Sequence, residues 1–128
     1  INTKTNSLEF AGAHRPLYLL RKGKLMEYKG DRKPIGGIPA KKRKEKNFTN
    51  HPVKLLKNDK IFIFSDGLTD QTGGTKGKKY QATRIKDALI KNPDLTMTRY
   101  ASFFAKDFLL WKGKYKQIDD VLLIGIEF

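Results

Sequence analysis

Residues 61–70 read Ile-Phe-Ile-Phe-Ser-Asp-Gly-Leu-Thr-Asp, and this is the most informative stretch of the chain. Its four leading apolar residues predict a buried strand. The strand runs directly into Ser65, Asp66 and Gly67. An acidic residue at the end of a rigid strand, followed by a glycine, can direct a carboxylate into a site. Asp66 is therefore the first candidate site residue; the alternative is a turn residue that caps Gly67.

A second acidic pair lies near the end of the chain. Asp119 and Asp120 lead directly into the apolar residues 121–126, which predict another buried strand. Two carboxylate clusters that each adjoin a buried strand suggest one shared site for a hard cation, because Mg²⁺ and Mn²⁺ prefer oxygen ligands. The alternative for Asp119 and Asp120 is an ordinary turn before a strand.

The composition limits the kinds of site that the chain can form. Its 128 residues suffice for one domain with a modest core, and we expect a single partial domain over residues 1–128. No cysteine is present, which excludes disulfides, thiolate metal sites and a cysteine nucleophile. Only two histidines, His14 and His51, are available, and this argues against a structural zinc site. Because the chain begins with isoleucine rather than methionine, we expect a fragment or a processed piece.

The sequence also bears on location. No apolar run approaches the length of a membrane span, and the first residues lack the pattern of a signal peptide. The lack of cysteine fits a reducing compartment. We therefore predict a cytoplasmic location for this segment, with any membrane anchor lying upstream.

The formal net charge is +14, which raises the question of an anionic partner. Lysine and arginine at this density are typical of proteins that bind nucleic acid or anionic membranes. Lysine greatly outnumbers arginine, however, and the usual nucleic-acid docking motifs are missing. We interpret the charge first as a solvated surface, and the basic run at residues 41–46 as either a solvated loop or a contact patch.

The rest of the sequence predicts strands, then two helices, then a final strand. Strands are expected at residues 8–11, 16–21, 25–28, 51–55, 61–65 and 121–128, with a hairpin turn at 22–24. Loops are expected at residues 30–37 and 71–79. The second loop is rich in glycine, threonine and lysine, so we expect it to be flexible and outside the core. This order predicts a layered α/β (α+β) domain with a largely antiparallel sheet.

Two consecutive helices are predicted on either side of Pro93. The first covers residues 82–91, and the second ends at Gly113, with Asp94 or Thr96 as its N-cap. Apolar residues recur at helical spacing along the second helix: Met97, Tyr100, Ala101, Phe104, Ala105, Phe108 and Leu109. Such a stripe is typical of a helix that packs on a sheet, and we interpret it in this way rather than as a binding surface.

Four segments resemble, in the same order, those of the SpoIIE-type branch of the metal-dependent type 2C protein serine/threonine phosphatases. They are residues 10–19, 33–37, 64–71 and 117–122. These segments resemble, respectively, the family's Ala-Gly-His/Ala-Asn-Pro-Leu strand pair, its Pro-Leu/Ile-Gly loop, its Ser/Thr-Asp-Gly metal motif and its terminal Asp-Asp motif. The resemblance covers essentially the whole chain, and the ordered set is more specific than any one of these short motifs.

The resemblance implies the later half of an α-β-β-α sandwich, which binds two Mn²⁺ or Mg²⁺ ions between its central sheets. Asp66 and Asp119 match the positions that ligate metal and serve catalysis. The supporting positions implied in the same way are Gly67, Asp120, His14, Gly12 and Gly36. In this family a metal-activated water attacks phosphoserine or phosphothreonine without a covalent enzyme intermediate. The substrates that the resemblance implies are phosphorylated regulatory proteins of the anti-sigma-factor antagonist type.

The chain departs from the family pattern in two ways. Leu122 replaces the threonine that commonly follows the terminal Asp-Asp pair, which we interpret as a mild change. The family's upstream Gly-Asp-x-x-Gly-His-Gly segment, whose aspartate bridges both metals, is not among these residues. We therefore expect the isolated chain to be inactive or nearly so. We also expect it to self-associate or to pair with the missing N-terminal half, because apolar faces would otherwise be exposed.

Three alternatives stay open from the sequence. The chain could be a basic nucleic-acid-binding module, although its basic run lacks interleaved aromatic residues. It could also be a non-catalytic scaffold that docks a phosphoprotein. Finally, His14 could face the site or have a structural role only.

Overall fold

The computed structural model describes residues 1–36 and 47–128. Gly37 and the basic run at residues 41–46 lie outside the described residues. The strands are β1 (Ser7–Phe10), β2 (Leu17–Arg21), β3 (Lys24–Tyr28), β4 (His51–Lys54), β5 (Lys60–Phe64), β6 (Thr72–Gly73), β7 (Lys78–Lys79) and β8 (Leu123–Glu127). The helices are α1 (Asp66–Asp70), α2 (Ala82–Lys91) and α3 (Met97–Lys112).

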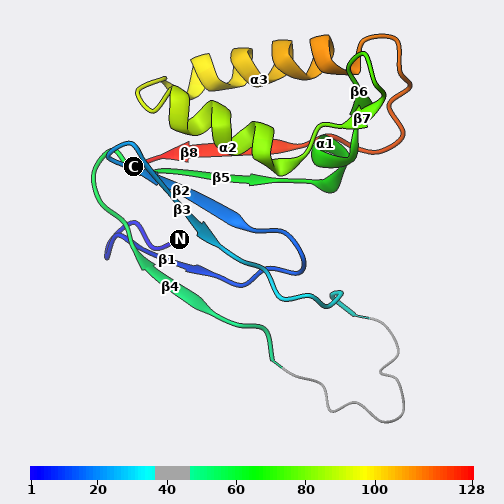
Figure 1. Cartoon of the computed structure of the whole chain (residues 1–128). Helices are drawn as coiled ribbons and strands as arrows, with labels where there is room; N and C mark the ends of the chain where they lie inside the picture. The colour runs from blue at the N-terminus through cyan, green and yellow to red at the C-terminus, as the bar shows by residue number, and fades with distance from the viewer. Residues whose placement is uncertain (37–46) are drawn as a thin grey trace, which may run out of the picture.

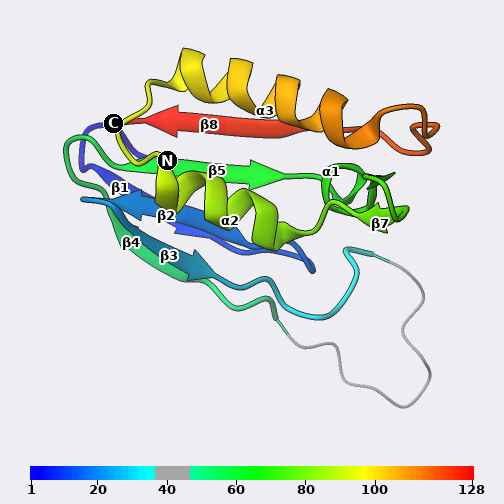
Figure 2. The ribbon, with the colours of Figure 1, turned by 45° about the horizontal axis from the view of Figure 1, so that its top comes forward.

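The main sheet has the order β3-β2-β5-β8, and every neighbouring pair in it is antiparallel. Helices α2 and α3 cover one face of this sheet, and the two-stranded ribbon of β1 and β4 lies on the other (Figures 1 and 2). The turn between β2 and β3 uses positive φ angles at Lys22 and Gly23, which match the twist of a tight hairpin. The expected strands, their antiparallel pairing and the two consecutive helices are therefore present.

The larger core lies between the sheet and the helices. Phe62 and Phe64 of β5 point toward the helices and are at most 6% exposed. From α3, the residues that meet them are Tyr100, Phe104 and Phe108. These three are spaced four residues apart, so they form one line along the helix facing the sheet.

The predicted apolar stripe of α3 was too wide. Ala101 and Ala105 are exposed, and Leu109 is 61% exposed. Each of these residues follows a buried aromatic residue, so it lies about 100° further around the helix and points away from the sheet. Thr96 is the N-cap, with its side chain accepting a hydrogen bond from the Arg99 backbone N–H, and Gly113 is the C-cap.

A second core lies beneath the ribbon. It joins Leu17, Leu19 and Ile61 of the main sheet to Leu8 and Val53 of the ribbon. The ribbon does not cover the whole sheet face, because Ile63, Ile124 and Ile126 are 39%, 39% and 38% exposed. No helix in the described part of the chain is long and apolar enough to cross a membrane.

The region after β5 differs from the sequence prediction. Residues Asp66–Asp70 form a short helix, and residues 71–79 contain the β6–β7 hairpin where a flexible loop was expected. The hairpin packs against the end of α3, where the Gly74 N–H donates to the Trp111 carbonyl oxygen over 2.7 Å. Gly73 permits this approach, because a Cβ there would overlap that carbonyl and lie 2.5 Å from Trp111 Cδ1. The glycines that suggested flexibility thus serve close packing.

The carboxylate of Asp59 connects the start of β5 to the end of β2. It is 1% exposed and accepts hydrogen bonds from Arg21 Nε at 2.8 Å, Arg21 Nη2 at 2.5 Å and the Leu56 N–H at 2.8 Å. Burial opposes ionisation of this carboxyl, but the hydrogen bonds from Arg21 and Leu56 outweigh it. The pKa of Asp59 therefore lies below its ordinary value.

This pKa shift predicts acid sensitivity. A carboxyl whose folded pKa is depressed stabilises the fold above its unfolded pKa of about 3.9, and this contribution is lost as the pH falls through the folded pKa. We expect the urea midpoint of the chain to fall as the pH is lowered below about 4. At neutral pH, the Asp59→Asn variant should have a lower urea midpoint than the wild type. On acidification, its midpoint should fall by less than that of the wild type. An equal pH-dependent loss in both proteins would contradict this role for Asp59.

Candidate metal centre

The two predicted acidic motifs meet at the end of β5 (Figure 1). Ser65 occupies the N-cap position of α1, but its hydroxyl makes no capping hydrogen bond. The Ser65 Oγ instead donates to the Asp120 carbonyl oxygen over 2.8 Å and accepts from the Leu122 N–H over 2.9 Å. The Ser65 N–H donates to the Leu122 carbonyl oxygen over 3.0 Å. Ser65 thus joins the segment before β8 to the start of α1.

Gly67 brings the same two segments into direct contact. A Cβ at this position would overlap the Asp120 carbonyl oxygen, lie 2.8 Å from the carbonyl carbon of Asp120 and 3.2 Å from that of Asp119. Such distances leave no room for a side chain, so only glycine allows α1 to approach residues 119–120 this closely. Asp66 and Asp119, which are far apart in the sequence, are therefore held on adjacent backbone segments.

The carboxylates of both candidate ligands are accessible. The Asp66 side chain is 57% exposed, and one Asp66 oxygen lies 3.9 Å from Arg15 Nη2. Asp119 is exposed, and its Oδ1 accepts a hydrogen bond from the Asp120 N–H over 2.8 Å. Asp120 contributes through its backbone, since its carbonyl oxygen receives the Ser65 hydroxyl.

The donor set fits a single hard cation, but two carboxylates are too few for the two-ion centre that the family resemblance implies. Two accessible carboxylates are suitable ligands for Mg²⁺ or Mn²⁺, which often keep several waters and use only one or two protein carboxylates. Within residues 1–36 and 47–128, no group of three or more His, Cys, Asp or Glu side chains is placed to hold a metal ion. Asp66 and Asp119 would therefore form part of a metal centre.

The turn between β1 and β2 lies beside α1 and contains two further predicted residues. Gly12 is buried, and a Cβ on it would lie 2.5 Å from the Arg15 carbonyl oxygen. His14 is exposed and has a positive φ of 61°, and its N–H donates to the Asp31 carbonyl oxygen over 2.8 Å. Both residues shape the turn, so their described contacts are structural.

Gly36 is the predicted residue with the weakest structural link to this region. It is exposed, has a φ of 75°, and has no atom within 4 Å of a Cβ built on it. No described contact brings it to Asp66 or Asp119. Gly36 adjoins the residues that the structure does not describe, so its predicted support of the site stays a prediction.

Arg15 and Thr69 were not among the site residues predicted from the sequence. Arg15 Nη1 lies 3.4 Å from the Thr69 hydroxyl, to which it donates, and the same guanidinium approaches Asp66. Thr69 is buried in α1, and its hydroxyl also donates to the Asp66 carbonyl oxygen over 3.2 Å. The position of Arg15 directly after the Gly12–His14 turn was the available signal, but only the fold shows that this turn faces α1.

A cluster of polar side chains joins α2 to α3. Arg84 of α2 donates to both carboxylate oxygens of Asp107 in α3, over 2.7 Å and 2.5 Å, and the Tyr80 hydroxyl donates to the same carboxylate. These hydrogen bonds, led by those from Arg84, hold the pKa of Asp107 below its ordinary value, while burial raises the pKa of Tyr80. The Trp111 indole N–H donates to the Gln71 carbonyl oxygen over 3.2 Å. The end of α3 is thereby attached to the residue that follows α1.

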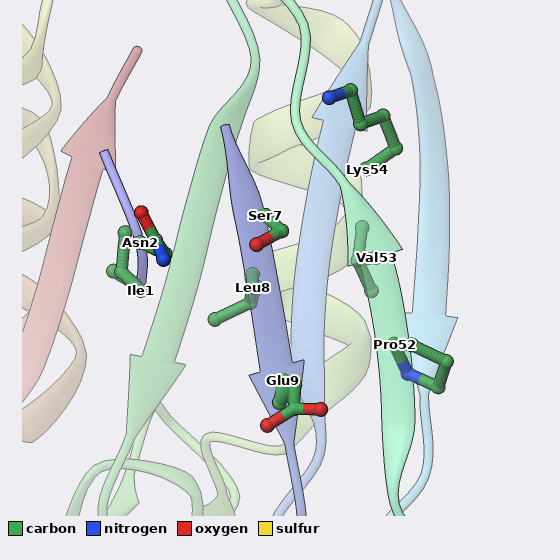
Figure 3. A pocket seen from close by; sticks show the side chains of 8 residues that line it. All are labelled: Ile1, Asn2, Ser7, Leu8, Glu9, Pro52, Val53 and Lys54. Atoms are coloured by element: carbon green, nitrogen blue, oxygen red, sulfur yellow. The ribbon is translucent and has the colours of Figure 1, made fainter. Parts of the chain in front are cut away.

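A pocket of about 550 Å³ lies elsewhere on the molecule (Figure 3). Its walls come from the N-terminus, β1 and β4: Ile1, Asn2, Ser7, Leu8, Glu9, Pro52, Val53 and Lys54. None of the predicted site residues lines it. This pocket is therefore separate from the candidate metal centre.

The chain matches a family model and is similar to solved protein structures. The family model described as Stage II sporulation protein E (SpoIIE) matches residues 1–128. The solved SiaA-PP2C domain of Pseudomonas aeruginosa is similar with a TM-score of 0.83 and 27% identity, covering 98% of this chain and 48% of that one. Among curated proteins, the sequence comparison found no match.

Two further structures are of the phosphatase domain of the cell fate determinant SpoIIE from Bacillus subtilis. The Mn-presoaked structure has a TM-score of 0.66 and 15% identity, and it covers 99% of this chain and 53% of that one. The other has a TM-score of 0.65 and 14% identity, with 99% and 54% covered. These likenesses confirm the expected fold class, and the chain spans about half the length of the structures it matches.

Proposed function

Because the chain belongs to the SpoIIE family, we propose that it forms the C-terminal part of a metal-dependent protein phosphatase. Its substrate would be phosphoserine or phosphothreonine on a regulatory protein of the anti-sigma-factor antagonist type. The observation that carries this proposal is the contact of Gly67 with the backbone of Asp119 and Asp120, which brings two acidic motifs to one end of β5. The similarity to a solved SiaA-PP2C domain and to the solved phosphatase domain of SpoIIE supports the same activity.

Each part of the site has a distinct role in this proposal. Asp66 and Asp119 would hold Mn²⁺ or Mg²⁺ through their carboxylates. When bound, these ions supply Lewis acidity, which lowers the pKa of water and offsets the charge of the phosphoryl oxygens. Ser65 and Gly67 hold the segment that carries Asp66 against the segment that carries Asp119. The Asp120 backbone is the point to which Ser65 is attached.

The remaining metal ligands would come from the other half of the domain. This proposal rests on the two carboxylates present among the described residues and on the similar solved domains, which are about twice as long. That half would also cover Ile63, Ile124 and Ile126, which are partly exposed on one face of the sheet. Without it, the isolated chain would be inactive and would self-associate through this apolar face.

The proposal is tested by comparing this chain alone with the full-length protein that contains it. With Mn²⁺ present, the full-length protein should hydrolyse both p-nitrophenyl phosphate and a phosphoserine protein, and the isolated chain should not. Addition of EDTA should remove the activity, and excess Mn²⁺ should restore it. A full-length protein without Mn²⁺-dependent hydrolysis would overturn the proposed function, and efficient turnover by the isolated chain would overturn the half-site proposal.

A further inference from the structure

We propose that Arg15 binds the phosphoryl group of the substrate, an inference that rests on the proposed function. Its guanidinium lies beside α1, with Nη2 3.9 Å from the Asp66 carboxylate and Nη1 3.4 Å from the Thr69 hydroxyl. The Arg15 side chain is 42% exposed, so an anion can approach it from solvent. The planar guanidinium matches the oxygen geometry of a phosphate better than any other side chain.

The backbone of Arg15 is held firmly in place. Two glycines pack against its carbonyl oxygen, since a Cβ on Gly12 would lie 2.5 Å away and one on Gly30 would lie 2.6 Å away. The Gly12 carbonyl accepts from the Asp31 N–H over 2.8 Å, and His14 adopts a left-handed conformation in the same turn. A non-glycine residue rarely adopts that conformation, so the turn is constrained by its surroundings. The base of the Arg15 side chain is therefore fixed beside α1.

The bonding of Arg15 differs from that of two structural arginines in the same chain. Arg21 donates to both oxygens of Asp59 at 2.8 Å and 2.5 Å, and Arg84 donates to both oxygens of Asp107 at 2.7 Å and 2.5 Å. These are short bidentate pairs that bind parts of the fold together. The contacts of Arg15 with Thr69 and Asp66 are both longer than 3 Å and use little of the five-donor capacity of a guanidinium.

A role as a simple counter-ion for Asp66 accounts less well for this geometry. An ion pair at 3.9 Å between two side chains that are 42% and 57% exposed contributes little stability. A phosphoryl group beside Asp66 would bring negative charge and several acceptor oxygens within reach of Arg15. The partly exposed guanidinium, with two long contacts, therefore keeps donor groups that a phosphoryl anion can engage.

The test measures phosphate binding separately from metal binding. In the full-length protein saturated with Mn²⁺, the affinity for inorganic phosphate is measured by calorimetry and by competitive inhibition of hydrolysis. Arg15→Ala should weaken phosphate binding and raise the KM for the phosphoprotein by roughly 10- to 100-fold, because charge-assisted hydrogen bonds are lost. Arg15→Lys should recover part of this loss, since it keeps the charge without the planar fork.

Two controls make the outcome decisive. Arg99→Ala removes one positive charge at an exposed position of α3 and should leave phosphate affinity unchanged. The affinity for Mn²⁺ should change less than about twofold in Arg15→Ala, as expected for loss of a weak exposed ion pair. Unchanged phosphate affinity in a folded Arg15→Ala protein, or a loss confined to Mn²⁺ affinity, would overturn the inference. A wild-type protein that lacks hydrolytic activity would instead contradict the proposed function, and calorimetry would still test Arg15.

Discussion

The Asp66→Asn variant of the full-length protein is expected to lose Mn²⁺-dependent hydrolysis by at least about a thousandfold, because a metal ligand supports several kcal/mol of charge stabilisation. Asparagine has nearly the same shape as aspartate, so the substitution removes the negative charge with little effect on packing. Asp66 is more than half exposed, and the fold should therefore retain its thermal midpoint. Turnover and Mn²⁺ affinity are measured on the same preparation.

Asp70→Asn is the matched control for this prediction. Asp70 lies at the other end of α1, is 53% exposed and pairs with Lys79 over 3.3 Å. Loss of the Asp70 charge should change the rate of hydrolysis by less than about twofold, because an exposed ion pair contributes little. Equal losses in the two variants would mean that charge near α1 matters in general, and survival of activity in Asp66→Asn would exclude Asp66 as a ligand.

The Gly67→Ala variant is expected to separate the two acidic segments without removing any acidic side chain. The new methyl group would overlap the Asp120 carbonyl, and backbone atoms cannot rotate away as a flexible side chain can. Overpacking of this kind costs about 1–3 kcal/mol and is relieved by a backbone shift. We expect the urea midpoint to fall and Mn²⁺ affinity in the full-length protein to drop by more than about tenfold, because both candidate ligands move.

Gly23→Ala serves as the control for glycine substitution, because Gly23 lies in the β2–β3 turn and is not a predicted site residue. The added methyl would lie no closer than 4.0 Å to the Pro93 Cβ, so its cost is limited to the positive φ of 74°, about 1 kcal/mol. It should leave Mn²⁺ affinity unchanged. If Gly67→Ala binds Mn²⁺ as tightly as the wild type, the contact between α1 and residues 119–120 does not position the ligands.

Local sequence patterns were sufficient to predict most of the secondary structure. The helix at Ala82–Lys91 has the predicted bounds, and β5 differs from its predicted range by one residue at each end. Apolar runs and helical spacing determine these elements within a few residues of sequence, so they can be recognised without the fold. The final strand starts two residues later than expected, at Leu123, because the Leu122 backbone is engaged by Ser65.

Features that depend on contacts between distant segments could not be predicted in this way. The packing of the β6–β7 hairpin on Trp111 and the approach of Arg15 to α1 both join residues more than thirty positions apart. The sequence suggested that Asp66 and Asp119 share a site, because each adjoins a predicted buried strand, and the family resemblance implied the same. The physical basis of this proximity is the missing side chain of Gly67 and the two hydrogen bonds of the Ser65 hydroxyl. Glycine content alone does not reveal whether a segment is loose or closely packed.

The pairing of β8 with β5 has a consequence for the order of folding. β2 and β3 form a local hairpin, whereas the pairing of Lys60 with Glu127 closes a loop that contains α1, α2 and α3. Closure of such a long loop carries a large entropic cost before its contacts are gained, so it is expected late in folding. The backbone of Asp119 and Asp120 comes to lie against Gly67 only when β8 docks. The candidate metal centre would therefore be assembled in one of the last steps of folding, and a cation bound there would preferentially stabilise the completed structure over its precursors.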